Sequence, residues 1–406
     1  MKYYQLIFAV ILFSCNNKKA TKHNFPDQVS SIADAQAIVR VVTEPMVIKI
    51  DMSKIVEGKF EDYFRRKEII YLDDKSPLGN ISKIEQHDSL LLVLDSDSSN
   101  QLFCFDTEGK LQWEFKDKGK GPLEYASLSD FAINVPNGTV DVMDNKNYKI
   151  IRLDLMTGKP ITEFKLGFFG YEFVAYDANK FLVYTGNFTY DNKLRYKLML
   201  VDDQRNVYSR NLFIPKKQRN KRYLTNKSFH QNKETIFFTE TLNDTIYTIK
   251  NDTLRTKYFV DFLDKKYPSE LLNNFSIELL DKLRKERPFV SAMKTIWEIG
   301  DNLFITFPYA SNYYTAVYNT KTKSTNIFER LESIEDPIHN EIYFNQEIDG
   351  SLLRVVQPYI IHSGKIKDNK TLMAKLKNDY PMRYEMITTT SLNSNPILIL
   401  YDYTFK

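Results

Sequence analysis

Cysteine, glycine and histidine are scarce in this 406-residue chain, which has two cysteines, 13 glycines and five histidines. Two cysteines give no disulfide framework if one of them is modified, and no two histidines lie at the spacing of a metal-ligand pair. Neither sign of charge predominates, since 56 basic and 52 acidic residues leave a net charge of +4. The sequence therefore predicts no metal, no cofactor and no nucleic-acid partner.

Long hydrophobic runs are missing too. The apolar run Leu6–Phe13 is too short to cross a bilayer as a mature helix, follows Lys2 and ends in Leu12-Phe13-Ser14-Cys15. This arrangement resembles a bacterial lipobox, in which the cysteine becomes the first mature residue and carries the lipid. We predict a lipoprotein signal peptide over residues 1–14 and lipidation of Cys15; the alternative is an ordinary secretory segment with a chance cysteine.

The segment after Cys15 is polar, and we expect residues 15–44 to be a flexible tether. Its first four residues are Asn16-Asn17-Lys18-Lys19, without an acidic residue. Surface-exported lipoproteins of some Gram-negative groups carry acidic residues at this place. The sequence therefore favours a lipid anchor in a bacterial membrane, with the outer membrane expected, and a protein that faces the periplasm.

Aromatic residues are abundant, with 26 tyrosines and 28 phenylalanines, and this composition suits half-buried strands. A turn signal returns between apolar segments at a near-constant interval. Asp106, Asp154, Asp202 and Asn251 follow one another at 48, 48 and 49 residues, and a further copy stands at Asn319. Repeats of this length with short strands are typical of propeller blades. We predict an all-β fold, a six-bladed β-propeller over residues 45–406.

Two segments interrupt the repeat. Residues 269–287 and 368–378 have apolar residues at helical spacing, and Pro381 is expected to stop the second helix. Such insertions usually gather on one face of a propeller, often the binding face. Ring closure requires a partner for the last blade, so we expect residues 68–72 to pair with the strand at 397–400.

One segment carries a resemblance to a known family. Gly119-Lys120-Gly121-Pro122-Leu123-Glu124-Tyr125, followed by Asp130-Phe131-Ala132-Ile133, resembles the segment between blades one and two of NHL-like six-bladed propeller lipoproteins. Ile348-Asp349-Gly350 and Asn395-Pro396-Ile397-Leu398 are also similar to family positions. Leu123 departs from the pattern, because a second glycine usually follows the proline. The resemblance implies fold and anchoring, and little about mechanism.

Three motifs each have a plainer interpretation. The 119–125 segment lacks the ending of a phosphate loop, so a turn between blades is favoured, with its glycines supplying positive φ. Residues 95–100 resemble the start of a calcium loop, but no glycine stands at the sixth place and a hairpin turn is favoured. Cys104 lies between two phenylalanines and is expected to be a buried core thiol.

Two segments are candidate binding sites. A basic run holds five cations, and an aromatic stretch could stack on a sugar or a peptide. The basic cations are Lys216, Lys217, Arg219, Lys221 and Arg222, and the aromatic stretch contributes Tyr309, Asn312, Tyr313 and Tyr314. A solvated loop and plain packing are the alternatives.

Two functions remain open from the sequence. The first is a lipid-anchored extracytoplasmic propeller that binds a peptide, a glycan or a protein partner in its funnel. The second is a hydrolase or lyase with its active site there. The absence of a nucleophile elbow or a clear carboxylate pair favours the binding module. A funnel lined by carboxylates, His or Arg would favour the enzyme, and one lined by Tyr, Asn and apolar groups the binding module.

Overall fold

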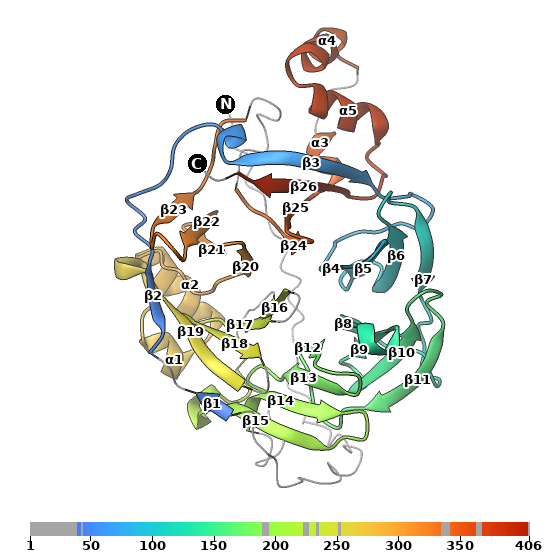
Figure 1. Cartoon of the computed structure of the whole chain (residues 1–406), viewed down its shortest axis with the longest axis vertical. Coiled ribbons are helices and arrows are strands. Elements are labelled where there is room, and N and C mark those ends of the chain that lie inside the picture. The colour runs from blue at the N-terminus through green and yellow to red at the C-terminus, as the bar shows by residue number, and fades with distance from the viewer. Residues whose placement is uncertain are drawn as a thin grey trace.

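The computed structural model describes residues 39–41, 44–188, 195–221, 227–232, 235–250, 253–333, 342–362 and 368–404. Six antiparallel sheets of four strands each surround a central axis, and one of them gains two further strands (Figure 1). The prediction of an all-β, six-bladed propeller is confirmed.

Each blade is built from strands in chain order, except the last. Blade one holds β4 (Lys83–His87), β5 (Leu90–Asp95), β6 (Gln101–Asp106) and β7 (Leu111–Phe115). Blade two holds β8 (Leu128–Asn134), β9 (Thr139–Asp144), β10 (Lys149–Asp154) and β11 (Pro160–Lys165). Blade three holds β12 (Glu172–Ala175), β13 (Lys180–Tyr184), β14 (Tyr196–Asp202) and β15 (Val207–Phe213).

The second half of the ring follows the same plan. Blade four holds β16 (Phe229–Asn232), β17 (Thr235–Phe238), β18 (Thr245–Lys250) and β19 (Thr253–Asp261). Blade five holds β20 (Thr295–Ile299), β21 (Asn302–Tyr309), β22 (Asn312–Asn319) and β23 (Thr325–Phe328). Blade six holds β24 (Gln346–Ile348), β25 (Ser351–Val356), β26 (Ile397–Tyr403) and β3 (Phe64–Tyr71).

The repeated aspartate ends the third strand of a blade and shapes the turn that follows. The Asp106 carboxylate accepts hydrogen bonds from the backbone N–H groups of Glu108 and Lys110. Asp202 binds two turn N–H groups in the same way, and the amide oxygen of Asn319 does so in blade five. Asp and Asn favour such turns because their short side chains reach the backbone two to four residues ahead.

The ring is closed by the N-terminal part of the chain. Strand β3 pairs antiparallel with β26, and Ile69, Ile70 and Tyr71 lie opposite Ile399, Leu398 and Ile397. The predicted closure between 68–72 and 397–400 is therefore confirmed. Without β3, the last strand of blade six would have an open edge with unpaired backbone groups.

The segment before β3 runs along the outside of two other blades. Strands β1 (Val39–Val41) and β2 (Met46–Lys49) pair in parallel with β19 of blade four, and the chain then bridges to Ile327 and Glu332 near blade five. Strand β1 lies inside the segment expected to be a tether.

The hydrophobic core is divided among the six interfaces between neighbouring blades. One cluster joins blades one and two, and it contains Leu92, Cys104 and Val142, all buried. Strands β5 and β9 are buried along their whole length because blades pack against both of their faces. Cys104 is a core thiol as predicted, and burial raises its pKa to about 12.

Both predicted insertions are helical, with different boundaries. The first is split into α1 (Glu270–Asn274) and α2 (Ile277–Glu286), because Ser276 is extended and caps α2. The second is a group of three helices, α3 (Pro358–Ile361), α4 (Lys370–Asp379) and α5 (Pro381–Thr389). The predicted helix, α4, ends at Asp379, just before Pro381, as expected. Pro381 also begins α5, because a helix tolerates proline at its first position.

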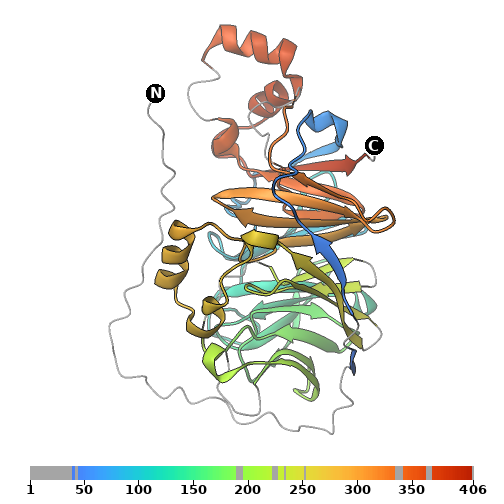
Figure 2. The same cartoon turned by 90° about the vertical axis from the view of Figure 1, so that its left-hand side faces the viewer.

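The helices α1 and α2 lie beside one face of the ring, whereas α4 and α5 extend beyond the outer edge of blade six (Figure 2). The chain leaves α2 and enters β20, and α3 follows the end of β25. Four short 3₁₀ turns complete the described elements: η1 (Phe60–Asp62), η2 (Val135–Asn137), η3 (Lys216–Gln218) and η4 (Leu263–Lys265).

The segment from Gly119 to Tyr125 forms the turn between blades one and two, as predicted, but for another reason. Neither glycine has a positive φ; Leu123 does, at 62°. A β-carbon on Gly119 would lie 1.9 Å from a carboxylate oxygen of Glu124, which accepts the Gly121 N–H at 2.7 Å. A glycine at position 119 allows the Glu124 carboxylate to approach the backbone closely, and the residue of this turn with a left-handed φ is Leu123.

Candidate functional site

Two cavities lie on the central axis of the ring, one from each face. The upper pocket, of about 850 Å³, is lined by the connections between blades and by the hairpins between second and third strands. The lower pocket, of about 940 Å³, is lined by the turns between first and second strands. The two share Lys83, Lys227, Phe229 and Gln346, so these four side chains form a waist between them.

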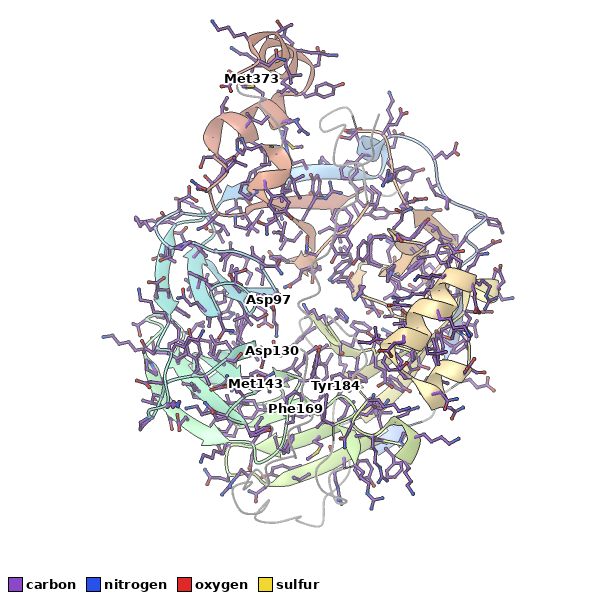
Figure 3. The ribbon with its side chains drawn as sticks, turned by 180° about the vertical axis from the view of Figure 1, so that it is seen from behind. Asp97, Asp130, Met143, Phe169, Tyr184 and Met373 are labelled. Atoms are coloured by element: carbon purple, nitrogen blue, oxygen red, sulfur yellow. The ribbon has the colours of Figure 1, made fainter. Side chains whose placement is uncertain are left out.

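The upper pocket is the candidate functional site because loops of several blades converge on it. Lys294 and Val355 line it, and they adjoin the points where the two helical insertions join the ring. The expected gathering of insertions on one face holds for these points of attachment, although α4 and α5 themselves extend beyond the outer edge of blade six. Figure 3 shows Asp97, Asp130 and Phe169 placed around the central opening.

Phe169, Tyr171 and Phe188 make one wall of the upper pocket. The Phe169 ring lies 6.2 Å from that of Tyr171 and 5.1 Å from that of Phe188. All three side chains are half-buried. Connections after β11 and β13 present them, so two neighbouring loops build the wall together. Half-buried rings of this kind offer faces for stacking against a ligand.

The carboxylates near the axis tie neighbouring blades together. Glu85 accepts the backbone N–H of Ile133 at 3.2 Å, Asp130 that of Phe173 at 2.8 Å, and Glu172 that of Ser228 at 2.7 Å. In each case the acid stands on the first strand of one blade and the donor on, or directly before, the first strand of the next. The first strand of each blade has no neighbouring strand on its axial side, and these carboxylates accept hydrogen bonds from N–H groups that would otherwise lack a partner there.

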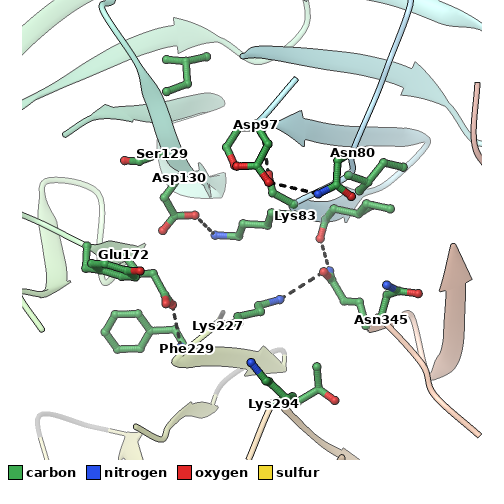
Figure 4. Close-up of a pocket in the computed structure, with 18 of the residues that line it drawn as sticks. Asn80, Lys83, Asp97, Ser129, Asp130, Glu172, Lys227, Phe229, Lys294 and Asn345 are labelled. Carbon is green, nitrogen blue, oxygen red and sulfur yellow. Dashed lines mark hydrogen bonds and ion pairs between the residues drawn. The ribbon is translucent and has the colours of Figure 1, made fainter. Parts of the chain in front are cut away.

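Lys83 completes this arrangement at the waist. Its ammonium lies 2.8 Å from Asp130 and 3.1 Å from Glu85, with the side chain 11% exposed (Figure 4). Burial alone would lower the pKa of Lys83, but the two carboxylates outweigh it and hold that pKa above its usual value. Lys83 and Asp130 therefore neutralise each other, and neither is free for a ligand.

Glu172 differs from the other carboxylates. It is 9% exposed, and its second oxygen, Oε1, has no hydrogen-bond partner within the described chain. Burial, and then the charge of Asp130, raises the pKa of Glu172 to about 7. A carboxyl group in this state changes charge near neutral pH.

Two further lysines line the upper pocket. Lys227 donates to the Gln346 side chain at 3.2 Å, and Gln346 donates to the carbonyl of Ile84 in blade one. For the Lys294 ammonium, the described residues provide no side-chain partner. Burial lowers the pKa of both lysines to about 8, helped by the charge of Lys83 for Lys227 and of Arg284 for Lys294.

The predicted aromatic stretch lies on the same face, outside the pocket wall. Tyr309 ends β21 and Asn312 begins β22, and Asn312 donates to Glu329 at 2.8 Å. Tyr314 is buried and stacks on Phe307, with ring centroids 5.8 Å apart. Tyr313 packs 4.6 Å from Tyr343, which does line the upper pocket. Ligand binding by this stretch stays a prediction.

The predicted basic run lies in the connection between β15 and β16. Lys216 and Lys217 are exposed in η3, Arg219 is half-buried, and Lys221 donates to the backbone of Asn273 in α1 at 3.3 Å. Arg222 and the lipidation residue Cys15 lie outside the described residues. The same connection supplies Lys227 to the pocket, so the basic segment reaches the axis through a residue that the sequence did not single out.

Sequence reasoning missed the residues that line the upper pocket. The aromatic run Phe168-Phe169-Gly170-Tyr171 directly precedes a first strand and could have signalled the wall. No comparable signal marks Glu172, Lys227 or Lys294, because each is an isolated charge in its local sequence. In the described part of the chain, no group of His, Cys, Asp and Glu could hold a metal ion, and no helix is long and apolar enough to cross a membrane.

The fold and the axial pocket define a class: a six-bladed β-propeller with a ligand-sized cavity at the loop-bearing end of its channel. A family model described as "Domain of unknown function (DUF4934)" matches residues 46–402. The chain belongs to this family. No functionally curated protein matches the sequence.

Solved structures share the fold. A Bacteroides fragilis NCTC 9343 protein that is described as exported is 16% identical, with a TM-score of 0.69 over 90% of this chain and 100% of that one. A DUF4221 family member from Bacteroides vulgatus ATCC 8482 is 11% identical, with a TM-score of 0.50 over 84% of this chain and 98% of that one. At such identities the likeness concerns the fold alone.

Proposed function

We propose that this protein is a lipid-anchored, extracytoplasmic binding module whose ligand occupies the upper pocket. The proposal rests on one observation: some of the pocket's side chains bond the protein backbone, and others remain available to a ligand. Asp130 and Glu172 are bound to backbone N–H groups, while the aromatic wall, the amides of Asn80 and Asn345, and Lys294 line the cavity. Figure 4 shows Asn80, Asn345 and Lys294 in this lining. A cavity of about 850 Å³ with a few convergent polar groups suits a small ligand.

A hydrolase or lyase in the same funnel is the less favoured alternative. It would use a pair of catalytic groups that face the substrate. Among the buried carboxylates of the described pocket lining, only Glu172 has an oxygen without a hydrogen-bond partner. Both oxygens of Asp130 are engaged, by Lys83 and by two backbone N–H groups. The buried part of the described lining thus offers one carboxyl group with a free oxygen, and the third carboxylate, Asp97, lies in an exposed hairpin and binds Asn80.

The pocket assignment is tested by ligand screening with melting temperature as the readout. We expect ligands that raise the melting temperature of the wild type to lose their effect in Phe169→Ala and Phe188→Ala, because the aromatic wall is truncated. Leu392→Ala is the matched control, since Leu392 is 63% exposed and outside the pocket lining. Ligands that act equally on all variants, or that are chemically converted by the protein, would contradict the proposal.

The anchor is tested separately, by fractionation of cells. The Cys15→Ala variant should move from the membrane fraction to the soluble fraction, because it lacks the thiol that carries the lipid. The exported Bacteroides neighbour supports a location outside the cytoplasm. Equal membrane association of wild type and variant would contradict the lipid anchor without affecting the pocket.

A further inference from the structure

The upper pocket is lined by positive charges, two of which no salt bridge within the described residues neutralises. Three cations line it, Lys83, Lys227 and Lys294, but Lys83 is neutralised by Asp130 at 2.8 Å. No salt bridge joins Lys227 or Lys294 to a carboxylate among the described residues. Figure 4 shows Lys227 between the Glu172 side and the Asn345 side of the cavity, and the amino end of Lys294 points into the same space.

The anionic side chains of the pocket do not cancel these two lysines. Asp97 lies in an exposed hairpin and accepts from Asn80 at 3.1 Å. Asp130 is paired with Lys83, and Glu172 binds the N–H groups of Ser228 and Phe229. Burial holds a large share of Glu172 in its neutral form at neutral pH. Two partly buried ammonium groups that no carboxylate of the described residues contacts in a salt bridge favour an anionic ligand.

The remaining lining suits a hydroxyl-rich ligand. Side-chain amides of Asn80 and Asn345 and the hydroxyls of Ser127 and Ser129 line the cavity. Asn80 donates one N–H to Asp97, Asn345 accepts the Val355 N–H, and Ser129 donates to the Met143 carbonyl. The second N–H of Asn80, the NH₂ group of Asn345 and the lone pairs of the hydroxyls can still bond a ligand. Sugar hydroxyls suit both kinds of group, because each can both donate and accept. Opposed to these polar groups, the wall of Phe169, Tyr171 and Phe188 offers faces on which a sugar ring can stack. The volume of about 850 Å³ admits a short saccharide.

We infer that the upper pocket binds an acidic saccharide, with the sugar carboxylate between Lys227 and Lys294 and a ring against the Phe169 wall. The inference rests on the proposed binding function and names its ligand class. A neutral sugar would bring no anionic partner to either ammonium group; Lys227 would keep only its hydrogen bond to Gln346. Two partly buried charges without a salt bridge would work against the selection of such a sugar.

Binding of an acidic sugar should depend on pH, because ionisable side chains surround the place proposed for its carboxylate. Glu172 faces Asp130 on β8, Lys83 on β4 and Lys227 before β16; Lys227 also faces Glu85, and Lys294 faces Arg284 on α2. As the pH rises, Glu172 loses its proton at a pKa of about 7 and the two lysines lose theirs at about 8. Each loss opposes an anion, so affinity falls with rising pH, by about tenfold per pH unit for each proton lost.

The test measures dissociation constants by calorimetry for uronic acids, a galacturonate trimer and N-acetylneuraminate, each beside its neutral counterpart. We expect the acids to bind at pH 6 and the neutral sugars to bind at least tenfold more weakly. Lys227→Met and Lys294→Met should each weaken binding of the acid by about 10- to 100-fold. Lys294→Arg should retain binding, and Lys217→Met, outside the pocket, should match the wild type.

Glu172→Gln provides a second and independent readout. A neutral Gln mimics the protonated acid, so this variant should lose the fall in affinity between pH 6 and 7.5 and keep the fall above pH 8. Neutral sugars that bind as well as acids, or lysine variants that bind normally, would overturn the acidic-ligand inference while leaving a binding pocket in place. If none of the acids binds, the inference is also overturned; other ligands that act through the aromatic wall would still support the proposed function.

Discussion

At the scale of single residues, Gly119 and Leu123 explain the most distinctive segment of the sequence. Gly119 is needed because the Glu124 carboxylate occupies the space of a β-carbon, and that carboxylate is held by the Gly121 N–H. Leu123 adopts a left-handed φ of 62°, which suits glycine better than leucine. Tyr125 completes the turn; it is fully buried and donates to the carbonyl of Asn100 at 2.7 Å.

The Gly119→Ala substitution should therefore lower the free energy of unfolding by about 1–3 kcal/mol, because Glu124 must move and give up its bond to Gly121. Chemical denaturation of the wild type, Gly119→Ala, Glu124→Ala and the double variant measures the effect as a cycle. The cost of Gly119→Ala should shrink when Glu124 is already truncated. An equal cost in both backgrounds would show that the carboxylate is not the obstacle.

At the scale of elements, one turn design is repeated around the ring. The side-chain oxygen at the end of the third strand accepts N–H bonds from the turn before the fourth strand, with aspartate at 106, 154 and 202 and asparagine at 319. Blade six replaces the fourth strand by β3 from the N-terminal part of the chain, and so needs no such turn. The sequence period thus reflects a local hydrogen-bonding requirement.

For this turn we predict different outcomes for two substitutions of Asp106. Asp106→Ala removes the acceptor of two backbone N–H bonds and should cost about 1–2 kcal/mol of unfolding free energy. Asp106→Asn should cost less than half of that, because the amide oxygen of Asn319 also accepts two turn N–H groups in blade five, those of Lys321 and Thr322. Equal destabilisation of the two variants in urea unfolding would show that the charge, and not the hydrogen-bond geometry, maintains the turn.

At the scale of the whole molecule, the N-terminal segment connects three blades. Strand β2 pairs with β19 of blade four, Ile55 bridges to Ile327 at blade five, and β3 completes blade six. Ile48 and Ile50 are fully buried in the cluster between blades four and five. The ring therefore depends on contacts between residues that lie far apart in the sequence, by 258 − 46 = 212 positions for β2 with β19 and by 397 − 71 = 326 for β3 with β26.

Truncation tests this dependence. A chain that begins at residue 45 keeps β2 and β3 and should lose little stability, whereas one that begins at residue 75 lacks both and should aggregate or melt at a much lower temperature. A chain that begins at residue 58 keeps β3 alone and should lie between them. A wild-type melting temperature for the chain beginning at 75 would contradict the closure.

The sequence by itself determined the blade repeat, the positions of most strands and the two helical insertions, because turn signals and apolar alternation are local properties. It also determined the closure, since a blade one strand short exposes an edge. Only the tertiary structure decided that β2 joins blade four and that Glu172, Lys227 and Lys294 share one pocket. These residues belong to different blades or to the connections before them, and their pKa values follow from burial and from the charges of other blades or, for Lys294, of Arg284 on α2. The local sequence does not indicate how deeply each of these side chains is buried. Their shifted pKa values therefore arise only when the ring is closed.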